Sequence, residues 1–212
     1  MTRYMTEPLM TAVTPERRSR PKPGERREQI LQALAGMLEQ PDGDRITTAA
    51  LAARLQVSEA ALYRHFASKA QMYEALIDFI EQTVFALINQ IEVRTAESGR
   101  RRVAQTVAML LQFAEKNPGM ARVMVGDALV LEHERLQHRM TLFFDKIEAT
   151  LKQSLREQGV TANAVTPTLE AQVCAAVMAA FVRGRLQRYV RSGFKRSPCE
   201  QLDACLALML AG

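Results

Sequence analysis

The side chains best suited to specific chemistry lie between positions 47 and 69, and that chemistry is hydrogen bonding to a nucleic acid. Donors that match phosphate oxygens recur in this segment, at Thr47, Thr48, Tyr63, His65 and Lys69. Glu59 can accept a hydrogen bond from the amino group of cytosine, and the methyl group of Ala60 or Ala61 can touch that of thymine. The segment therefore combines groups that hold a phosphate backbone with groups that read bases.

Two short helices joined by a tight turn at residues 56–57 are expected to position these side chains. Thr47 or Thr48 is expected to cap the first helix and Ser58 the second. The residues expected to face inward are Leu51, Leu55, Val57, Leu62 and Phe66. This pattern predicts a helix-turn-helix whose second helix enters the major groove of DNA. The predicted DNA-contacting residues are Thr47, Thr48, Ser58, Glu59, Ala60, Ala61, Tyr63, Arg64, His65 and Lys69.

Some of these aromatic side chains also have a purely structural interpretation. Tyr63 and His65 could be core residues of a small helical bundle, although contact with DNA is the interpretation we favour for both. Phe66 is expected to belong to the core, because it ends the second helix on its apolar side.

Catalytic chemistry has no comparable basis in the sequence. His133 and His138 are five residues apart, whereas two ligands on one helical face need a spacing of three or four. The three cysteines are scattered, and there is no glycine-rich phosphate loop. The sequence therefore predicts a protein that is not an enzyme and that holds no metal and no cofactor.

Composition predicts an all-helical protein in a reducing compartment. The 212 residues are rich in good helix formers and lack runs of alternating β-branched residues. An odd number of cysteines, three, suggests free thiols, and no segment is long and apolar enough to span a membrane. We therefore expect a cytoplasmic protein, and its net charge of +5 is compatible with a nucleic-acid partner.

The chain divides into three parts. Residues 1–23 hold five Lys or Arg against two Glu, and four of the eight prolines, which predicts a flexible basic arm. Residues 24–70 are expected to form a three-helix DNA-binding domain, and residues 71–212 a helical regulatory and dimerisation domain, for about nine helices in all. The longest is expected at about 129–158, where Leu136, Met140, Phe143, Ile147, Leu151 and Leu155 form a stripe with coiled-coil character.

A known family shares these features. The segment Ile46–Asp78, with Leu62-Tyr63-Arg64-His65-Phe66 and then Lys69, resembles the DNA-binding domain of the TetR repressors. Downstream segments resemble the nucleoid occlusion factors within that family, among them Asn117-Pro118-Gly119, Arg135-Leu136-Gln137 and Arg188-Tyr189-Val190-Arg191-Ser192. The resemblance extends over nearly the whole chain after residue 24.

The resemblance implies a homodimer on double-stranded chromosomal DNA at the nucleoid, with the last two helices forming the dimer interface. While bound, the protein would antagonise assembly of the division protein FtsZ, so that the septum does not close over the nucleoid. The positions that match the family's FtsZ-docking surface are Phe79, Lys116 and Asn117, with Lys116 where the family has Arg. Leu87 occupies an expected basic position, so the surface is altered.

Two alternatives stay open. A ligand-responsive TetR-type repressor would need a roomy pocket, lined by aromatic residues such as Phe113, Phe143, Phe144, Phe181, Tyr189 and Phe194. The second concerns residues 183–196, which hold six Lys or Arg and no acidic residue. This run is either a solvated helix end favoured by the helix dipole or a surface for a partner.

Overall fold

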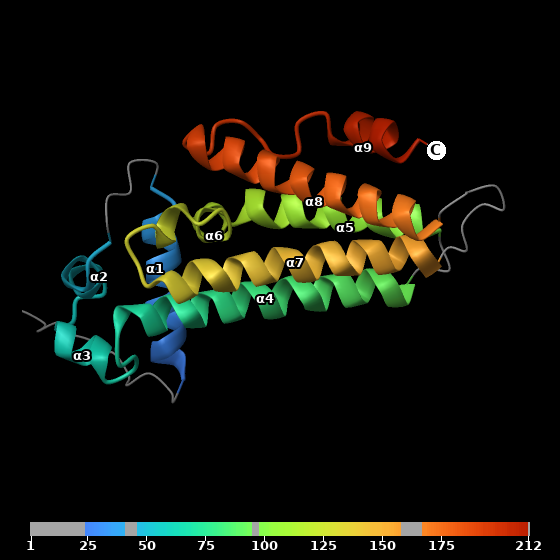
Figure 1. Cartoon of the computed structure of the whole chain (residues 1–212). Helices are drawn as coiled ribbons and strands as arrows, with labels where there is room; N and C mark the ends of the chain where they lie inside the picture. The colour runs from blue at the N-terminus through green and yellow to red at the C-terminus, as the bar shows by residue number, and fades with distance from the viewer. Residues whose placement is uncertain (1–23, 41–45, 95–97, 158–166, 212) are drawn as a thin grey trace, which may run out of the picture.

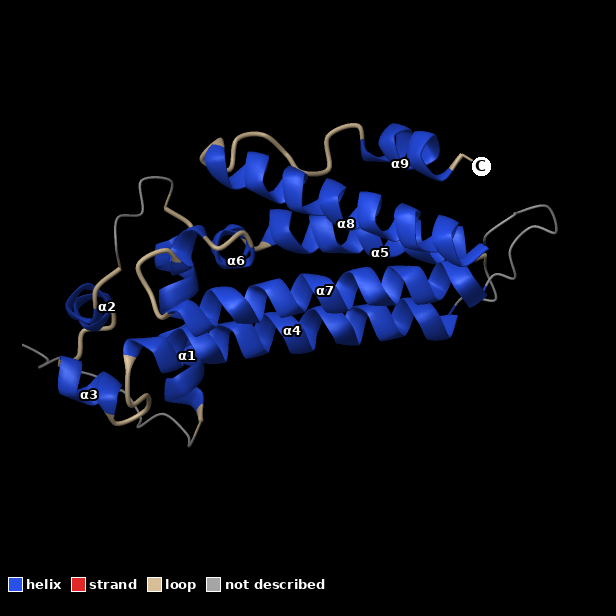
Figure 2. Cartoon of the chain, viewed as in Figure 1, coloured by secondary structure: helices blue, strands red, loops and turns tan. Residues whose placement is uncertain are grey.

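The computed structural model describes residues 24–40, 46–94, 98–157 and 167–211, and these ranges contain nine α-helices and no strand (Figures 1 and 2). The expected all-α class is thus confirmed. The helices are α1 (Glu25–Leu38), α2 (Thr48–Arg54), α3 (Glu59–Tyr63), α4 (Lys69–Arg94), α5 (Gly99–Lys116), α6 (Pro118–Met124), α7 (Glu134–Glu157), α8 (Pro167–Arg191) and α9 (Leu202–Leu210). The expected basic arm, 1–23, lies outside the described residues.

Helices α1, α2 and α3 gather at one end of the molecule, against the beginning of α4 (Figure 1). Leu51, Leu62 and Phe66 are each only 1% exposed and form the core of this end. Leu55 and Val57 pack against them while partly buried. The predicted inward face of the helix-turn-helix is therefore confirmed, including the core position of Phe66.

The remaining helices form a layered body. Helices α4 and α7 lie side by side along its length, α5 and α8 lie next to them, and α9 rests on the outside (Figure 1). The expected apolar stripe of α7 is its buried face. Its members Leu136, Met140, Phe143, Ile147 and Leu151 are all at most 3% exposed, and Leu155 packs against the core while partly buried. It packs within the subunit against α4, α5 and α8.

Helix α7 begins five residues later than expected, at Glu134. Gly126 adopts a left-handed φ of 86°, and Asp127–Leu129 form a 3₁₀ turn. Residues 130–132 then form a turn and a bend, and His133 Nδ1 accepts a hydrogen bond of 3.3 Å from the Arg135 N–H at the beginning of α7.

Ion pairs join α7 and the turn before it to α4. They are Lys69–Glu132 at 2.5 Å, Arg135–Glu74 at 2.8 Å, and Arg139 with both Asp78 and Glu81 at 2.8 Å. Several bridges in one row fix the register of two long helices better than an isolated exposed pair, which contributes little.

Helix α6 holds α1 against the body through a close backbone contact. Gly119 sits so near α1 that an added Cβ atom would lie 2.2 Å from the Ala35 carbonyl oxygen and 3.2 Å from Leu38 Cβ. One turn later, Arg122 donates a hydrogen bond of 2.8 Å to the carbonyl of Gln40, just beyond the end of α1. Only glycine permits this approach, because any side chain would push the two backbones apart.

We therefore predict that Gly119→Ala destabilises the protein by about 1–3 kcal/mol, since the clash is with backbone atoms that cannot rotate away. Gly36→Ala in α1 is the matched control: its Cβ would only touch Arg54 Nη2, at 3.5 Å. That change should add about 0.5–1 kcal/mol, because alanine favours a helix interior. Urea unfolding of both variants at one protein concentration measures the difference. Equal stabilities would contradict the contact.

Candidate nucleic-acid interface

Helix α3 presents its outer face to solvent. Ser58 caps it by accepting a hydrogen bond of 3.3 Å from the Ala61 backbone N–H, as expected. Glu59, Ala60 and Arg64 are exposed, Ala61 is half-buried, and Tyr63 is 46% exposed. The alternative that Tyr63 is a core residue is therefore wrong. This face has the mix of small and polar groups that a helix needs in a DNA groove.

A side-chain hydrogen bond links α2 to α3. Thr48 Oγ1 donates to Glu59 Oε2 at 2.6 Å, across the turn. Glu59 retains its second carboxylate oxygen for a cytosine amino group. The Thr48 hydroxyl, in contrast, has its only proton engaged, so contact with a phosphate requires this bond to open.

Thr47 and Ser58 have two tasks that are compatible. Thr47 Oγ1 accepts a hydrogen bond of 3.1 Å from Ala50 N and caps α2, as Ser58 caps α3. A hydroxyl group can accept from the helix and still donate its own proton to a phosphate. The predicted DNA contacts of both residues therefore remain possible with their caps intact.

The segment that follows α3 is anchored by a residue that the sequence did not single out. Arg27 Nη1 donates to the His65 carbonyl oxygen at 2.9 Å, and its guanidinium lies 4.1 Å from the centroid of the Phe66 ring. The His65 side chain itself is exposed. A pattern of spacing could not reveal this contact, because Arg27 and His65 are 38 residues apart.

Lys69 is engaged inside the protein. Its Nζ lies 2.5 Å from a Glu132 carboxylate oxygen, with the Lys69 and Glu132 side chains only 20% and 11% exposed, and also 5.6 Å from the centre of the Tyr73 ring. Burial, with Glu132 as a second cause, raises the pKa of Tyr73. Lys69 would have to exchange Glu132 for a phosphate in order to contact DNA, so that contact remains a prediction.

The residues expected to dock a protein partner occupy two elements. Phe79 on α4 is 47% exposed, although most large apolar side chains of that helix are buried. Lys116 is exposed at the end of α5. Asn117 joins α5 to α6, and its Nδ2 donates to the Phe113 carbonyl at 2.7 Å. The rings and side chains of Phe79 and Lys116 are therefore accessible at the surface.

The aromatic residues that would line an enclosed ligand pocket are mostly core residues. Phe113, Phe143, Phe144 and Tyr189 are at most 9% exposed. The hollow of about 370 Å³ beside α6, α7 and α8 has Phe144 as its only aromatic lining residue among the described ones. Its Arg183 is stacked over that ring at 4.6 Å and lies 3.8 Å from Asp145. This arrangement does not favour a drug-binding pocket.

No group of three potential metal ligands converges anywhere in the described ranges. Within the same ranges, no helix has the length and apolarity to cross a membrane. Cys174, Cys199 and Cys205 are free, and burial together with Glu115 raises the pKa of Cys199 to about 11, which keeps that thiol protonated at neutral pH.

Comparison with known proteins identifies both halves of the chain. Residues 30–76 match the family model described as bacterial regulatory proteins, tetR family, and residues 98–211 match the tetracyclin repressor-like C-terminal domain of the SlmA-like type. The nucleoid occlusion factor SlmA of Marinomonas sp. (strain MWYL1) is 50% identical over 179 residues, which cover 84% of this chain and 90% of the relative. The SlmA of Vibrio vulnificus (strain YJ016) is 47% identical over 191 residues, 90% of this chain and 96% of the relative.

Solved structures agree on the fold. A TetR-family transcriptional regulator from Bordetella parapertussis 12822 superimposes with a TM-score of 0.67 at 18% identity, covering 89% of this chain and 96% of that one. The regulator FadR from Bacillus subtilis, in complex with stearoyl-CoA, gives 0.68 at 14% identity over 87% and 98%. Helix-turn-helix geometry, family models and close relatives thus lead to one conclusion: this chain belongs to the SlmA nucleoid occlusion factors of the TetR family.

Proposed function

We propose that this protein is a nucleoid occlusion factor that binds specific sites on double-stranded chromosomal DNA as a dimer and, while bound, antagonises FtsZ polymerisation. The observation that carries the proposal is the solvent-facing side of α3, held on capped helices, in a chain about half identical to SlmA proteins. It acts by binding and catalyses no reaction, and it works in the cytoplasm at the nucleoid. The helix-turn-helix unit, residues 24–70, reads DNA, and residues 71–212 form the regulatory and dimerisation unit.

Sequence recognition is assigned to the N-terminal part of α3. Glu59, Ala60 and Ala61 come first in the helix, where a recognition helix meets base edges. Tyr63 and Arg64 follow, with donors directed at phosphates together with those of Thr47, Ser58 and His65. Thr48 supports this set by holding Glu59 in place, at 2.6 Å.

We predict that Tyr63→Ala weakens operator binding several-fold and leaves stability nearly unchanged, because the ring is 46% exposed in the free protein. Phe79→Ala is the matched control: its ring is 47% exposed on α4, away from the helix-turn-helix, and DNA binding should persist. Fluorescence anisotropy with a duplex selected from random sequence measures both. If the Tyr63→Ala variant binds the duplex with full affinity, Tyr63 does not contribute to the DNA interface.

The outer face of α8 supports the dimer. The small residues on this helix separate into two sets: Ala175 and Ala179 are buried inside the subunit, whereas Ala176, Ala180 and Gly184 are exposed. Beside the exposed set lie large apolar side chains at 47–57% exposure, namely Leu169, Val173 and Val177. On α9, Leu208 is 80% exposed. An apolar face on two adjacent helices fits a four-helix interface with a second copy.

We predict that Val177→Arg converts the dimer to a monomer, since a charge would be buried without a partner at the centre of the interface. Phe79→Arg is the matched control, because Phe79 and Val177 are each 47% exposed. Phe79 lies on α4, outside the proposed interface, so its variant should remain a dimer. Sedimentation velocity over a range of concentrations distinguishes the two. A Val177→Arg protein that stays dimeric at low concentration would place the interface elsewhere.

The FtsZ-docking role is assigned to Phe79, Lys116 and Asn117. Phe79 supplies an exposed apolar ring that can anchor an extended peptide. Lys116 can pair with carboxylates of an acidic tail. The side-chain oxygen of Asn117 is free to accept a hydrogen bond from the backbone of that tail, because only Nδ2 is engaged, with the Phe113 carbonyl. Leu87 is half-buried on α4 and adds no charge.

We predict that Lys116→Glu lowers binding to an FtsZ tail peptide at least several-fold while operator binding survives, because the reversal turns attraction for an acidic peptide into repulsion. Lys146→Glu, an exposed lysine on α7, is the control for net charge and should bind the peptide normally. Both activities are measured on one preparation of each variant. Unchanged peptide binding, or a parallel loss of both activities, would show that this surface is not the docking site.

A further inference from the structure

The DNA-binding end of this protein is poor in available positive charge. Residues 24–80 contain six Lys or Arg against eight Asp or Glu. Three of those six cations already have a partner within the protein: Lys69 pairs with Glu132 at 2.5 Å, Arg27 donates to the His65 carbonyl at 2.9 Å, and Arg26 donates to the Gln29 side-chain oxygen at 2.8 Å. Affinity for DNA depends strongly on cations that neutralise phosphates. Cations elsewhere on the described surface could supply the missing contacts with phosphates.

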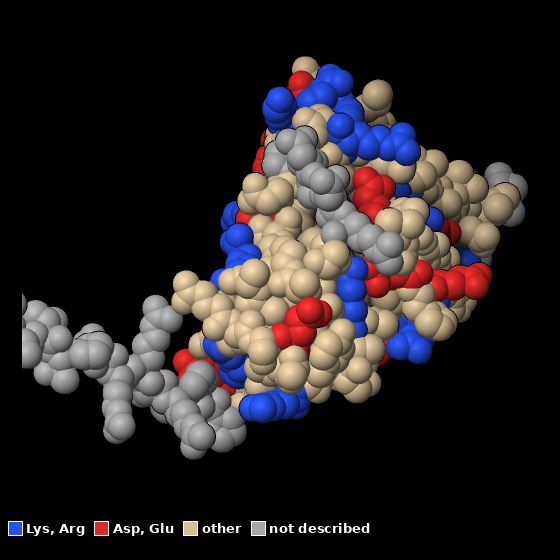
Figure 3. Space-filling view, turned by 90° about the vertical axis from the view of Figure 1, so that its left-hand side faces the viewer, with Lys and Arg blue, Asp and Glu red and all other residues tan. Residues whose placement is uncertain are grey.

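Positively charged side chains gather at the C-terminal end of α8. We name Arg188, Arg191, Lys195 and Arg196 the α8-end cluster. Three of its members, Arg188, Arg191 and Arg196, line a shallow hollow of about 470 Å³ together with Gly184, Gln187 and Ser192. Viewed from the side of α2 and α3, Lys and Arg side chains gather at the top of the molecule (Figure 3), which is where α8 ends in Figure 1.

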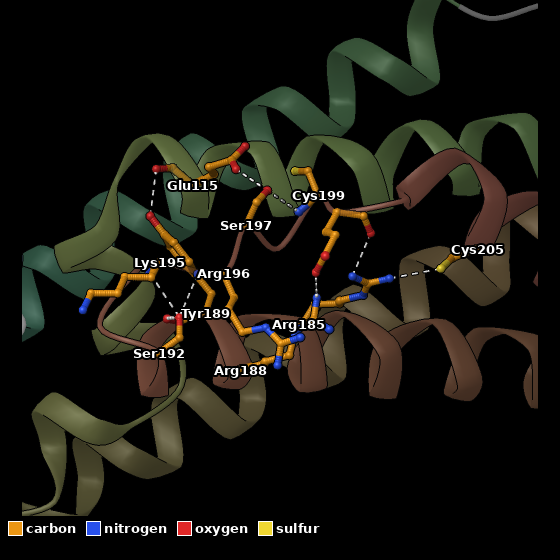
Figure 4. Close-up of polar contacts among 11 residues, drawn as sticks. Glu115, Arg185, Arg188, Tyr189, Ser192, Lys195, Arg196, Ser197, Cys199 and Cys205 are labelled. Carbon is orange, nitrogen blue, oxygen red and sulfur yellow. Dashed lines mark hydrogen bonds and ion pairs between the residues drawn. The ribbon is translucent and has the colours of Figure 1, made fainter.

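The turn that carries the second half of the cluster is rigidly built. Ser192 Oγ accepts hydrogen bonds from the backbone N–H groups of Lys195 at 3.1 Å and Arg196 at 2.9 Å, and it donates to the Tyr189 carbonyl at 2.7 Å (Figure 4). Phe194 holds a left-handed φ of 62°, a conformation that is unfavourable for a residue with a side chain. Its ring packs on Tyr189, with 5.2 Å between the centroids. Strained backbone of this kind often marks a functional surface.

The charge of the cluster is largely uncompensated. Within the described part of the chain, no carboxylate lies at ion-pair distance from Arg191, Lys195 or Arg196. Arg188 meets Glu200 at 3.1 Å through Nη2, whereas its buried Nε has no hydrogen-bond partner among the described residues. A helix dipole explains cations in the last turn but not those beyond it, and here backbone N–H groups already satisfy the last carbonyls of α8.

We propose that the α8-end cluster is a second DNA-contacting surface, which binds the phosphate backbone between the two sites read by the α3 helices of a dimer. The inference rests on the proposed function, because it requires both DNA binding and a dimer interface on α8. The cluster continues the α8 face assigned to that interface, so two copies would lie near each other beside the twofold axis. Their mutual repulsion is relieved by a polyanion lying across both.

The test is the salt dependence of DNA affinity in full-length protein. Arg191→Gln/Lys195→Gln removes two cations from the cluster, and Arg156→Gln/Lys146→Gln removes one arginine and one lysine, both exposed, from α7. Affinities for the selected duplex and for a scrambled duplex are measured over a series of salt concentrations. The cluster variant should lose about 0.9 in the slope of log K against log salt per lost phosphate contact, or about 3.6 for the four cations removed from a dimer, on both duplexes. The ratio of the two affinities should hardly change, because phosphates carry no sequence information.

The outcomes separate this proposal from the function on which it rests. If wild-type protein binds the selected duplex tightly and both double variants keep its slope, the cluster does not contact DNA. Equal loss of slope in both variants would indicate an effect of net charge alone and would also overturn the proposal. If wild-type protein does not discriminate between the duplexes, sequence-specific binding itself is wrong. Loss of FtsZ-peptide binding with an unchanged slope would assign the cluster to the protein partner instead.

Discussion

The geometry of DNA recognition depends on the backbone contact between α1 and α6. Helix α3 is only five residues long, too short to be stable or to hold a direction by itself. Its direction comes from α1, α2 and the beginning of α4, and α1 is fixed in turn where Gly119 approaches Ala35 and where Arg122 bonds Gln40. The contact with α6 therefore helps to determine where α3 points.

Local features of the site could be predicted from the sequence, because they depend on neighbouring residues. Thr47 and Ser58 cap α2 and α3 through N–H groups three residues ahead, and Leu62 and Phe66 fall on the apolar side of a short helix. The Lys69–Glu132 pair could not be predicted, since its members are 63 residues apart and meet only after α4 and α7 have packed. Spacing along one helix contains no information about such a pair.

The two faces of α8 illustrate a second limit. Alanines occupy both the buried positions 175 and 179 and the exposed positions 176 and 180, so apolar periodicity alone does not reveal which side faces the subunit core. The neighbouring residues resolve the ambiguity: Met178 and Val182 are fully buried, whereas Val173 and Val177 are about half exposed. The inner apolar side of α8 is buried inside the subunit, and the outer one is the side that we assign to the proposed dimer.

Arg122 connects the two surfaces that we assign to DNA. Its guanidinium bonds the Gln40 carbonyl at 2.8 Å, at the end of the first helix of the DNA-binding unit, and lies 5.0 Å from the centroid of the Phe194 ring. Phe194 belongs to the turn that presents Lys195 and Arg196. Both the helix-turn-helix and the α8-end cluster are thus attached to the seven-residue helix α6. Asn117 joins α6 directly to α5, and it also belongs to the proposed FtsZ-docking set. A partner that displaces this junction would therefore move both of the proposed DNA-facing surfaces together. Coupling between the partner and DNA then needs no long pathway, only a change in the position of one short helix.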